Sequence, residues 1–294
     1  MGVLIQVLLS GILVGGLYGA ISSGLSLSFG ISRVANFAHG DFVTIGMYLM
    51  VVAVGFMGSF GLLLLPVIAV IVGLLGTLFY IALLRRTHVS AATEDEAHLP
   101  QIIITAAAST LIQSVLLAVF GSSDRSVSTV LDGSWHVLGL SLSKPQVVAF
   151  VVSLAAFVVL DAVVNRTEAG RALRAIVDDG EAASAVGVNQ PRMLAISAGV
   201  GVALAGLAGG LLATYQTVNP VTGFGYLPIA FVVIVLGGLG SIRGAFIAGL
   251  LVGVLQQLAA TYVNLQAQNI AVWVLFLIIL LVRPNGLFGR KVTT

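Results

Sequence analysis

Long runs without a charged side chain dominate this sequence. Asp, Glu, Lys and Arg are absent from residues 1–32, 42–84, 97–123, 145–160, 193–242 and 244–282. A bilayer core about 30 Å thick needs only about 20 apolar residues in a helix to cross it. The pattern therefore predicts membrane-spanning helices, with one short segment that is broken or re-entrant. We expect the segments at about 4–29, 42–60, 62–84, 100–120, 145–164, 192–215, 226–240 (the short one), 244–263 and 269–283.

Composition supports the same class of fold. The 294 residues are 59 % hydrophobic and 8 % charged, with a mean hydropathy of +1.12. These values are typical of a polytopic membrane protein with very little chain outside the bilayer. We expect an all-α membrane helical bundle of about eight or nine transmembrane segments, some of them broken, forming a single domain over 1–294. Cysteine is absent, which excludes disulfides, thiol catalysis and thiolate metal sites.

Basic side chains predict the orientation of these segments. They gather in three regions, at Arg85 and Arg86, within 166–192, and within 283–291. Loops rich in Lys and Arg face the cytoplasm in most membrane proteins. All three regions fit on that side together, which leaves 121–144 outside. Nine crossings would then also place the N-terminus outside.

Glycine is frequent, and its spacing is regular in places. Gly11, Gly15 and Gly19 repeat every four residues, and Gly240 and Gly244 have the same spacing. Small residues on one helix face let a neighbouring backbone approach closely in a membrane. We interpret these glycines as helix-packing positions. Packing within the bundle, a subunit contact and a pathway-lining helix are all compatible with the pattern.

A polar segment between two glycines, 30–41, interrupts the first apolar stretch. Irregular backbone at membrane depth survives only where protein buries it or water reaches it, and ionisable residues there are functional candidates. An interfacial turn whose charged side chains reach the headgroups is the alternative. A weakly similar break occurs at 236–244. The candidate substrate-pathway residues in the first break are Arg33, Asn36, Phe37, His39 and Asp41.

One block of the chain is strongly polar. Nine of the 24 charged side chains lie within 161–192. Thr167 is a plausible cap for a short helix, and Asp178 could cap a second one, with Glu181 three residues later completing a capping box. Gly187 suits the left-handed position that ends a helix. Such a small-sided helix fits a groove on another protein, although a solvated cytoplasmic loop has the same composition.

The order Glu181, Ala182, Ala183 and, after three further residues, Gly187 resembles the EAA loop of ABC-importer permeases. The run 170–175 and the two aspartates at 178–179 resemble more narrowly the branched-chain amino acid permeases. So do residues 33–41, 235–245 and 283–290, and the early break fits the shorter of that system's two permeases. The resemblance covers most of the chain. It implies a cytoplasmic coupling loop at about 165–191 that contacts an ATPase through Arg171, Arg174, Asp178, Glu181, Ala182, Ala183 and Gly187.

The resemblance further implies a five-part importer with a type II-like fold in a prokaryotic cell membrane. Its parts would be two permeases, expected to form a heterodimer, two cytoplasmic ATP-binding subunits and an extracytoplasmic binding protein. Residues Ala35, Asp41 and Arg243 depart from the family pattern. The chain has no Gly-x4-Gly-Lys-Ser/Thr phosphate loop, so it cannot be the ATPase. We expect partner subunits to use ATP and Mg²⁺, and this chain not to be an enzyme. We expect no cofactor, metal or nucleic acid on it.

Other functions fit the residues less well. The substrate could be a branched-chain amino acid, another amino acid, urea or a short amide. An ion-coupled secondary transporter is the main rival, but it needs a buried carboxylate near the midplane, and only Asp41 and Asp161 come near the membrane. A channel lacks a filter-like motif. An intramembrane enzyme lacks a base beside a nucleophile, because His39, His88, His98 and His136 show no pairing pattern.

Overall fold

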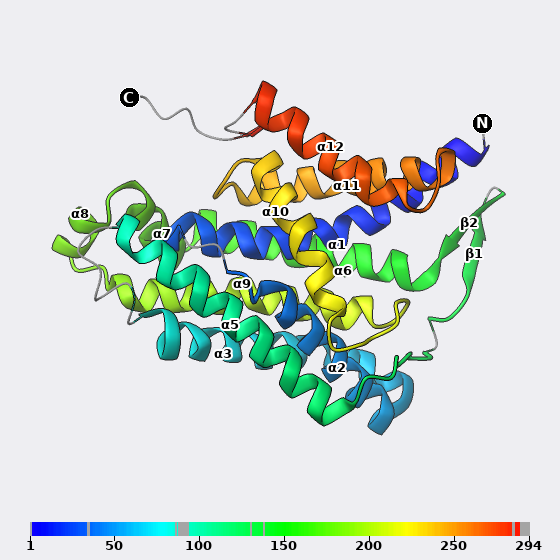
Figure 1. Cartoon of the computed structure of the whole chain (residues 1–294), viewed down its shortest axis with the longest axis horizontal. Coiled ribbons are helices and arrows are strands. Elements are labelled where there is room, and N and C mark those ends of the chain that lie inside the picture. The colour runs from blue at the N-terminus through cyan, green and yellow to red at the C-terminus, as the bar shows by residue number, and fades with distance from the viewer. Residues whose placement is uncertain are drawn as a thin grey trace.

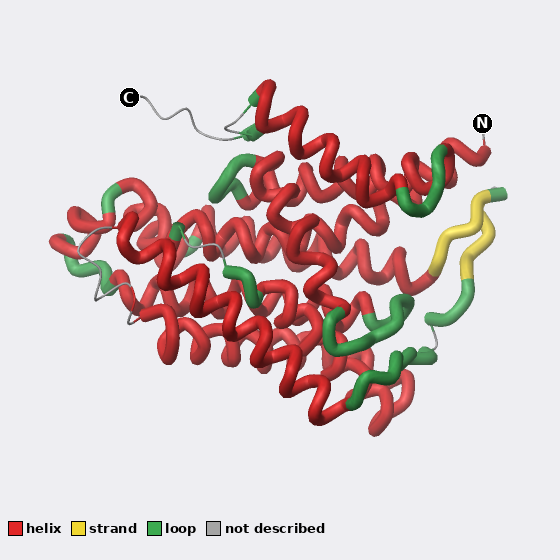
Figure 2. Tube along the Cα trace, in the orientation of Figure 1, coloured by secondary structure: helices red, strands yellow, loops and turns green. Residues whose placement is uncertain are grey.

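A computed structural model describes residues 2–33, 36–85, 87, 94–129, 131–137, 139–283 and 286–288. Ala35, Arg86, His88, Arg290 and Lys291, which enter the expectations above, lie outside these residues, as does the side chain of His98. Figure 1 shows a bundle of long helices with one small hairpin at the end where the chain begins. Figure 2 shows how little of the described chain is anything but helix.

The helices follow the apolar segments closely. Six are long and apolar enough, among the described residues, to cross a membrane: Gly2–Ser32, His39–Leu84, Leu99–Phe120, Lys144–Arg166, Gln190–Leu212 and Ile242–Tyr262. This confirms the predicted all-α membrane bundle. The elements are α1 (Gly2–Ser32), α2 (His39–Met57), η1 (Gly58–Leu64), α3 (Leu65–Phe79), η2 (Tyr80–Leu84), α5 (Glu94–Phe120), β1 (Ser134–Val137), β2 (Leu140–Ser143), α6 (Lys144–Arg166), α7 (Glu168–Asp178), α8 (Gly180–Ala185), α9 (Gln190–Leu212), η3 (Thr222–Gly225), α10 (Tyr226–Gly237), α11 (Ile242–Tyr262) and α12 (Ala267–Val282).

The run His39–Leu84 is two segments rather than one. A Cβ added to Gly61 would lie 2.7 Å from the carbonyl carbon of Ala53. In a straight helix these residues would be about 12 Å apart along the axis, at 1.5 Å per residue. The chain therefore turns back at η1, where Gly58 has a positive φ of 57°. This matches the separate segments expected at 42–60 and 62–84.

Two features differ from a simple set of crossings. The segment expected at 226–240 is the 12-residue helix α10, about 18 Å long, which is too short to span the bilayer core. A short 3-10 turn, η3, precedes it, so this element is broken, as expected. The hairpin β1–β2 was not expected. Its strands pair antiparallel, from Ser134 with Ser143 to Val137 with Leu140.

Glycine lets α1 and α11 pack backbone against backbone. A Cβ at Gly11 would lie 2.6 Å from the Cα of Val254, and one at Gly15 would lie 2.7 Å from the Cα of Leu250. Gly19 faces Phe246 in the same way. Packing, not the hydrophobic effect, holds helices together in lipid, so such close approach matters there. The face that these three glycines share is therefore a contact within this chain.

The two polar breaks meet at one end of the bundle. Gly30 lies against Gly240, where an added Cβ would be 2.8 Å from the partner Cα, and Gly244 lies against Gly237. The amide of Leu287 donates to the carbonyl of Leu236 at 2.8 Å in the same region. The glycines at 240 and 244 thus serve packing near the breaks as well.

The described parts of the three basic regions lie at this end too. The end of η2 packs with the start of α9 and with the end of α1, through Leu84, Leu194 and Ile31. The opposite end carries the hairpin, and there Gln6 near the N-terminus accepts a hydrogen bond from the amide of Ser141 at 2.9 Å. The described parts of the basic regions thus lie at one end of the bundle, and the hairpin and the N-terminal residues lie at the other, as the predicted topology requires.

Candidate functional site

The polar block forms two short helices beyond the end of the bundle, at the left of Figure 1. Helix α7 is amphipathic and buries Gly170, Leu173 and Ile176. The Thr167 hydroxyl accepts a hydrogen bond from the Gly170 amide at 3.1 Å, so this residue caps α7 as predicted. Gly170 sits directly against the backbone of Val164, which leaves no room for a side chain. Helix α7 is therefore fastened to the end of α6.

The predicted cap of the second helix is wrong by one residue. Asp178 is the last residue of α7 and is itself helical, so it cannot serve as the extended residue that an N-cap must be. Asp179 takes that place, with φ −157°, and its carboxylate accepts from the Ala182 amide at 2.9 Å. Glu181 then stands two residues after the cap, so the predicted capping box does not form.

Helix α8 presents a small exposed surface. Ala183 is buried and anchors the helix, whereas Glu181, Ala182 and Ser184 are exposed. Val186, just after the helix, is 82 % exposed, which is unusual for an aliphatic side chain in a polar setting. Gly187 has φ +93°, the left-handed conformation predicted for it.

The charged residues of the polar block differ in exposure and in what they contact. Arg171 is exposed and pairs with Glu168 at 3.3 Å, a surface pair that contributes little stability. Arg174 is partly buried and donates to the Val164 carbonyl, which ties α7 to α6. Asp178 is exposed. Of the candidate coupling residues, Ala183 and Arg174 thus hold the segment in place. The exposed ones that a partner could touch are Arg171, Asp178, Glu181, Ala182 and Gly187.

The first polar break spans very different environments. Arg33 is exposed and ends α1 with a positive φ of 53°. Asn36 is 9 % exposed, and its side-chain oxygen accepts from the Ala38 amide at 3.0 Å. Phe37 packs against Phe231 of α10, with ring centroids 5.6 Å apart. The break is therefore a built turn that leads into α2, and Asn36 has a clear local role in it.

His39 and Asp41 lie inside the bundle. His39 is 1 % exposed, and its Nε2 lies 3.1 Å from the carbonyl oxygen of Ile21 in α1. Asp41 is fully buried, and its Oδ1 accepts a 2.8 Å hydrogen bond from the Gln113 amide of α5. Asp41 therefore does not reach the headgroups, which removes the interfacial turn as an explanation for it.

Helix α5 carries a polar face that sequence reasoning missed. Its polar residues at every fourth position share one helix face. Three of them are 4 % exposed or less, and the fourth is the partner of Asp41. The spacing alone, inside an otherwise apolar span, was a usable signal. The four residues are Gln101, Thr105, Ser109 and Gln113.

Buried polar atoms without a partner lie on α1 and on α2, and α2 contacts α5. Among the described residues these include the hydroxyls of Ser22 and Ser26 on α1, and Asp41 Oδ2 and the Tyr48 hydroxyl on α2. A polar group left unpaired in an apolar setting is costly. Polar groups within membrane spans therefore tend to mark pathways for polar solutes.

An ion pair between α6 and α11 was also missed. Arg243 donates to both carboxylate oxygens of Asp161, from Nε at 2.6 Å and from Nη2 at 2.8 Å. Asn165 adds a third donor to the same carboxylate at 2.9 Å. Arg243 was noted only as a departure from a family pattern, and Asp161 only as a carboxylate near the membrane edge.

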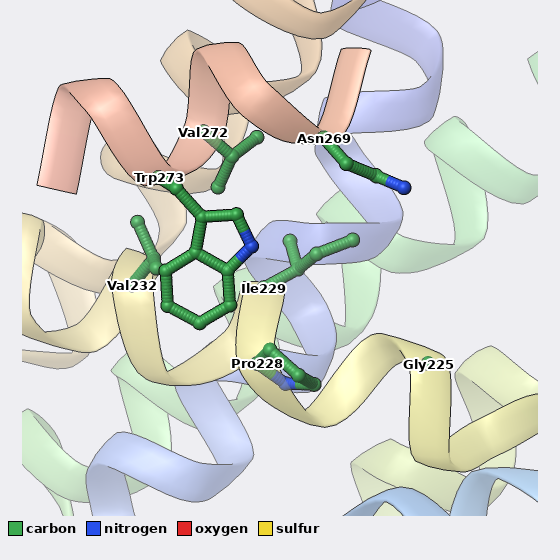
Figure 3. A pocket seen from close by; sticks show the side chains of 7 residues that line it. All are labelled: Gly225, Pro228, Ile229, Val232, Asn269, Val272 and Trp273. Atoms are coloured by element: carbon green, nitrogen blue, oxygen red, sulfur yellow. The ribbon is translucent and has the colours of Figure 1, made fainter. Parts of the chain in front are cut away.

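Two of the cavities lined by the described residues could admit a small molecule. One, of about 390 Å³, lies between the second half of α5 and the turn at 219–221, with Gln113 in its wall. The other, of about 150 Å³, lies between α10 and α12. Figure 3 shows the second cavity, where Trp273 and Asn269 of α12 face Pro228 and Ile229 of α10. It is smaller, and Asn269 is its only polar side chain apart from the Trp273 ring nitrogen, so it suits a polar solute poorly.

The fold and these sites define an integral membrane permease, a bundle with buried polar groups inside and two short exposed helices at one end. The chain belongs to the family described as branched-chain amino acid transport system / permease component, which matches residues 7–283. It is 30 % identical to the high-affinity branched-chain amino acid transport system permease protein LivH of Salmonella typhimurium, over 97 % of this chain and 96 % of that protein. The same identity and coverage relate it to BraD of Pseudomonas aeruginosa, a permease protein described in the same words.

A second kind of permease is also similar. LivM of Escherichia coli, again a high-affinity branched-chain amino acid transport system permease protein, is 25 % identical over 92 % of this chain and 67 % of its own length. No solved structure matches the chain.

Proposed function

We propose that this chain is the membrane-spanning permease subunit of an ATP-driven importer for branched-chain or related amino acids. The observation that carries the proposal is the exposed helix α8, held beyond the bundle in a chain of this family. In this proposal an extracytoplasmic binding protein delivers the substrate. A second permease and two cytoplasmic ATP-binding subunits complete the assembly, and those ATP-binding subunits bind ATP and Mg²⁺.

The geometry of the segment 168–187 supports a docking role. Helix α7 is fixed to α6 by the buried Gly170 and by the Arg174 hydrogen bond, so force on α8 is passed directly into a membrane-spanning helix. Helix α8 has small side chains and an exposed Val186 at its end. Removal of apolar surface from water is the main driving force of most protein–protein association. A neighbouring ATPase subunit would therefore bind this surface.

The test is reconstitution of the chain in proteoliposomes with its candidate partner subunits and binding protein. We expect uptake of radiolabelled leucine. This uptake should require ATP on the same side of the membrane as the ATP-binding subunits. Val186→Asp should abolish co-purification of the ATPase and reduce uptake, because it places a charge in the docking pocket. Val263→Asp is the matched control, since Val263 is also strongly exposed, at 71 %, but lies after α11, at the opposite end from α8.

Two results would contradict the proposal. Uptake driven by a proton or sodium gradient without ATP would establish an ion-coupled transporter instead. Equal ATPase association by the two variants would show that α8 is not the docking element.

A further inference from the structure

The larger cavity has the size and the lining of a small-ligand site. Its volume of about 390 Å³ falls within the range of about 300–1,000 Å³ typical of such sites. One part of its wall is polar, with Thr110, Gln113 and Ser114 on α5. The rest includes the apolar Leu117 and Val221. Since Val221 belongs to the turn after α9 at the hairpin end, the cavity lies toward the side predicted to be extracytoplasmic.

The three polar side chains from α5 offer acceptors and almost no donors, whereas Ser122 and Asn219, which also line the cavity, carry groups that can donate. The Thr110 hydroxyl donates to the Ala106 carbonyl at 3.2 Å, and the Ser114 hydroxyl donates to the Thr110 carbonyl at 2.8 Å. Each hydroxyl has a single hydrogen to donate, so each has only lone pairs left. A ligand that meets these side chains would have to supply the hydrogens itself.

Gln113 also offers only an acceptor to a ligand, because both hydrogens of its amide are already used. Its amide nitrogen donates to Asp41 at 2.8 Å and to the Ser109 hydroxyl at 3.2 Å, which uses both of its hydrogens. The carboxylate accepts only, so it fixes the amide with its nitrogen inward. The Gln113 carbonyl oxygen is then the group that remains for a ligand.

Asp41 lies one side chain behind this wall. It is fully buried, and its second carboxylate oxygen has no hydrogen-bond partner among the described residues. Burial without a cationic partner among the described residues disfavours the ionised carboxylate, so an ammonium group in the cavity would favour its charged form and be attracted to it. At the rim of the same cavity Asn219 donates to a second carboxylate, that of Asp124, at 3.2 Å. Arg125, which follows Asp124 in the chain, donates to the Phe120 carbonyl and lies over the Phe120 ring.

We propose that this cavity is an entry site for a zwitterionic amino acid, with the ammonium group bound by the acceptors of Thr110, Gln113 and Ser114 in front of Asp41. The aliphatic side chain of the substrate lies along Leu117 and Val221. This inference rests on the proposed function. It adds a position for the substrate and a reason why the site would select a solute with an ammonium group. Thr110 and Ser114 are exposed in the single chain, and in this proposal the second permease covers the open side of the cavity.

The first test uses the absence of cysteine from the chain. In the assembled importer, Ser114→Cys is treated with a cationic and with an anionic methanethiosulfonate reagent, both membrane-impermeant, from the extracytoplasmic side. We expect the cationic reagent to react several-fold faster. Asp41→Asn, which keeps the shape of the side chain, should remove that preference. Val115→Cys is the control, because Val115 is exposed on the same helix but does not line the cavity, and it should show no charge preference.

The second test is transport by the same proteoliposomes. Thr110→Val and Asp41→Asn should each raise the KM for leucine several-fold, whereas Val115→Cys, which lies outside the cavity, should leave the KM near the wild-type value. A Ser114→Cys protein without charge preference, together with an unchanged KM in both variants, would overturn the site and leave the proposed function standing. Transport of urea or a short amide that is insensitive to Asp41→Asn would overturn the ammonium assignment. A wild-type importer with no ATP-driven amino acid uptake would overturn the proposed function and this inference together.

Discussion

Gly187 provides a test of α8 in which backbone conformation is the only variable. Its φ of +93° lies in the region that residues with a Cβ rarely adopt, yet no atom lies within 4 Å of the position a Cβ would take. A substitution there causes no collision. Gly187→Val therefore introduces backbone strain alone, and a β-branched residue is among the least tolerant of this conformation.

The expected magnitude follows from that strain. An L-residue in the left-handed helical conformation costs about 1–2 kcal/mol relative to glycine. Helix α8 has only six residues, and Ala183 is the one that is buried, so little else holds it in place. The chain would relieve the strain by unwinding the last turn. A cost of about 1–2 kcal/mol changes the ratio of the docking to the unwound conformation by about 5–30-fold, and the apparent affinity for the ATPase falls in proportion to the docking population that is lost.

The assay is a titration of the permease in nanodiscs with the ATPase subunit, followed by uptake at matched membrane abundance. Gly187→Asn is the matched control, because asparagine tolerates positive φ better than other residues with a Cβ. We expect weak binding and slow uptake for Gly187→Val and near-normal values for Gly187→Asn. If valine and asparagine bind the ATPase as tightly as glycine does, the conformation of this turn does not matter for coupling and the reasoning fails.

Three further predictions concern other parts of the chain. Cysteines introduced singly at Ser184 and Ser128, both exposed, should react with an impermeant reagent from opposite sides of the membrane; reaction of both in intact cells would disprove the topology. Asn36→Leu leaves the buried Ala38 amide unsatisfied, a cost of about 1–3 kcal/mol, and should lower uptake of labelled substrate at matched abundance, whereas Asn36→Asp keeps the acceptor; wild-type uptake by the leucine variant would show the turn to be dispensable. Asp161→Arg and Arg243→Asp should each reduce uptake, and their combination should restore part of it by re-forming the pair in reverse; failure of the double variant to exceed both single ones would show that the ion pair is not what matters.

The features that the sequence alone determines are those that depend on short stretches of consecutive residues. The charge-free runs predict the membrane helices, because a span depends on the average polarity of about 20 consecutive residues. Thr167 as a cap and Gly187 at a left-handed position depend on the backbone within a few residues of each. The one local error, Asp178 in place of Asp179, arose because the cap belongs to whichever residue follows the last turn of α7, and pattern alone does not locate that turn.

The pairings between distant segments were decided only by the tertiary structure. Gln113 reaches Asp41 across 72 positions of sequence, and Arg243 reaches Asp161 across 82. Each pair exists because two helices pack at a particular rotation and depth, which hydropathy does not encode. The same holds for Gly15, whose spacing predicts a close neighbour but not that the neighbour is α11 of the same chain. Local sequence sets which side chains a helix presents, and only packing in three dimensions sets what they meet.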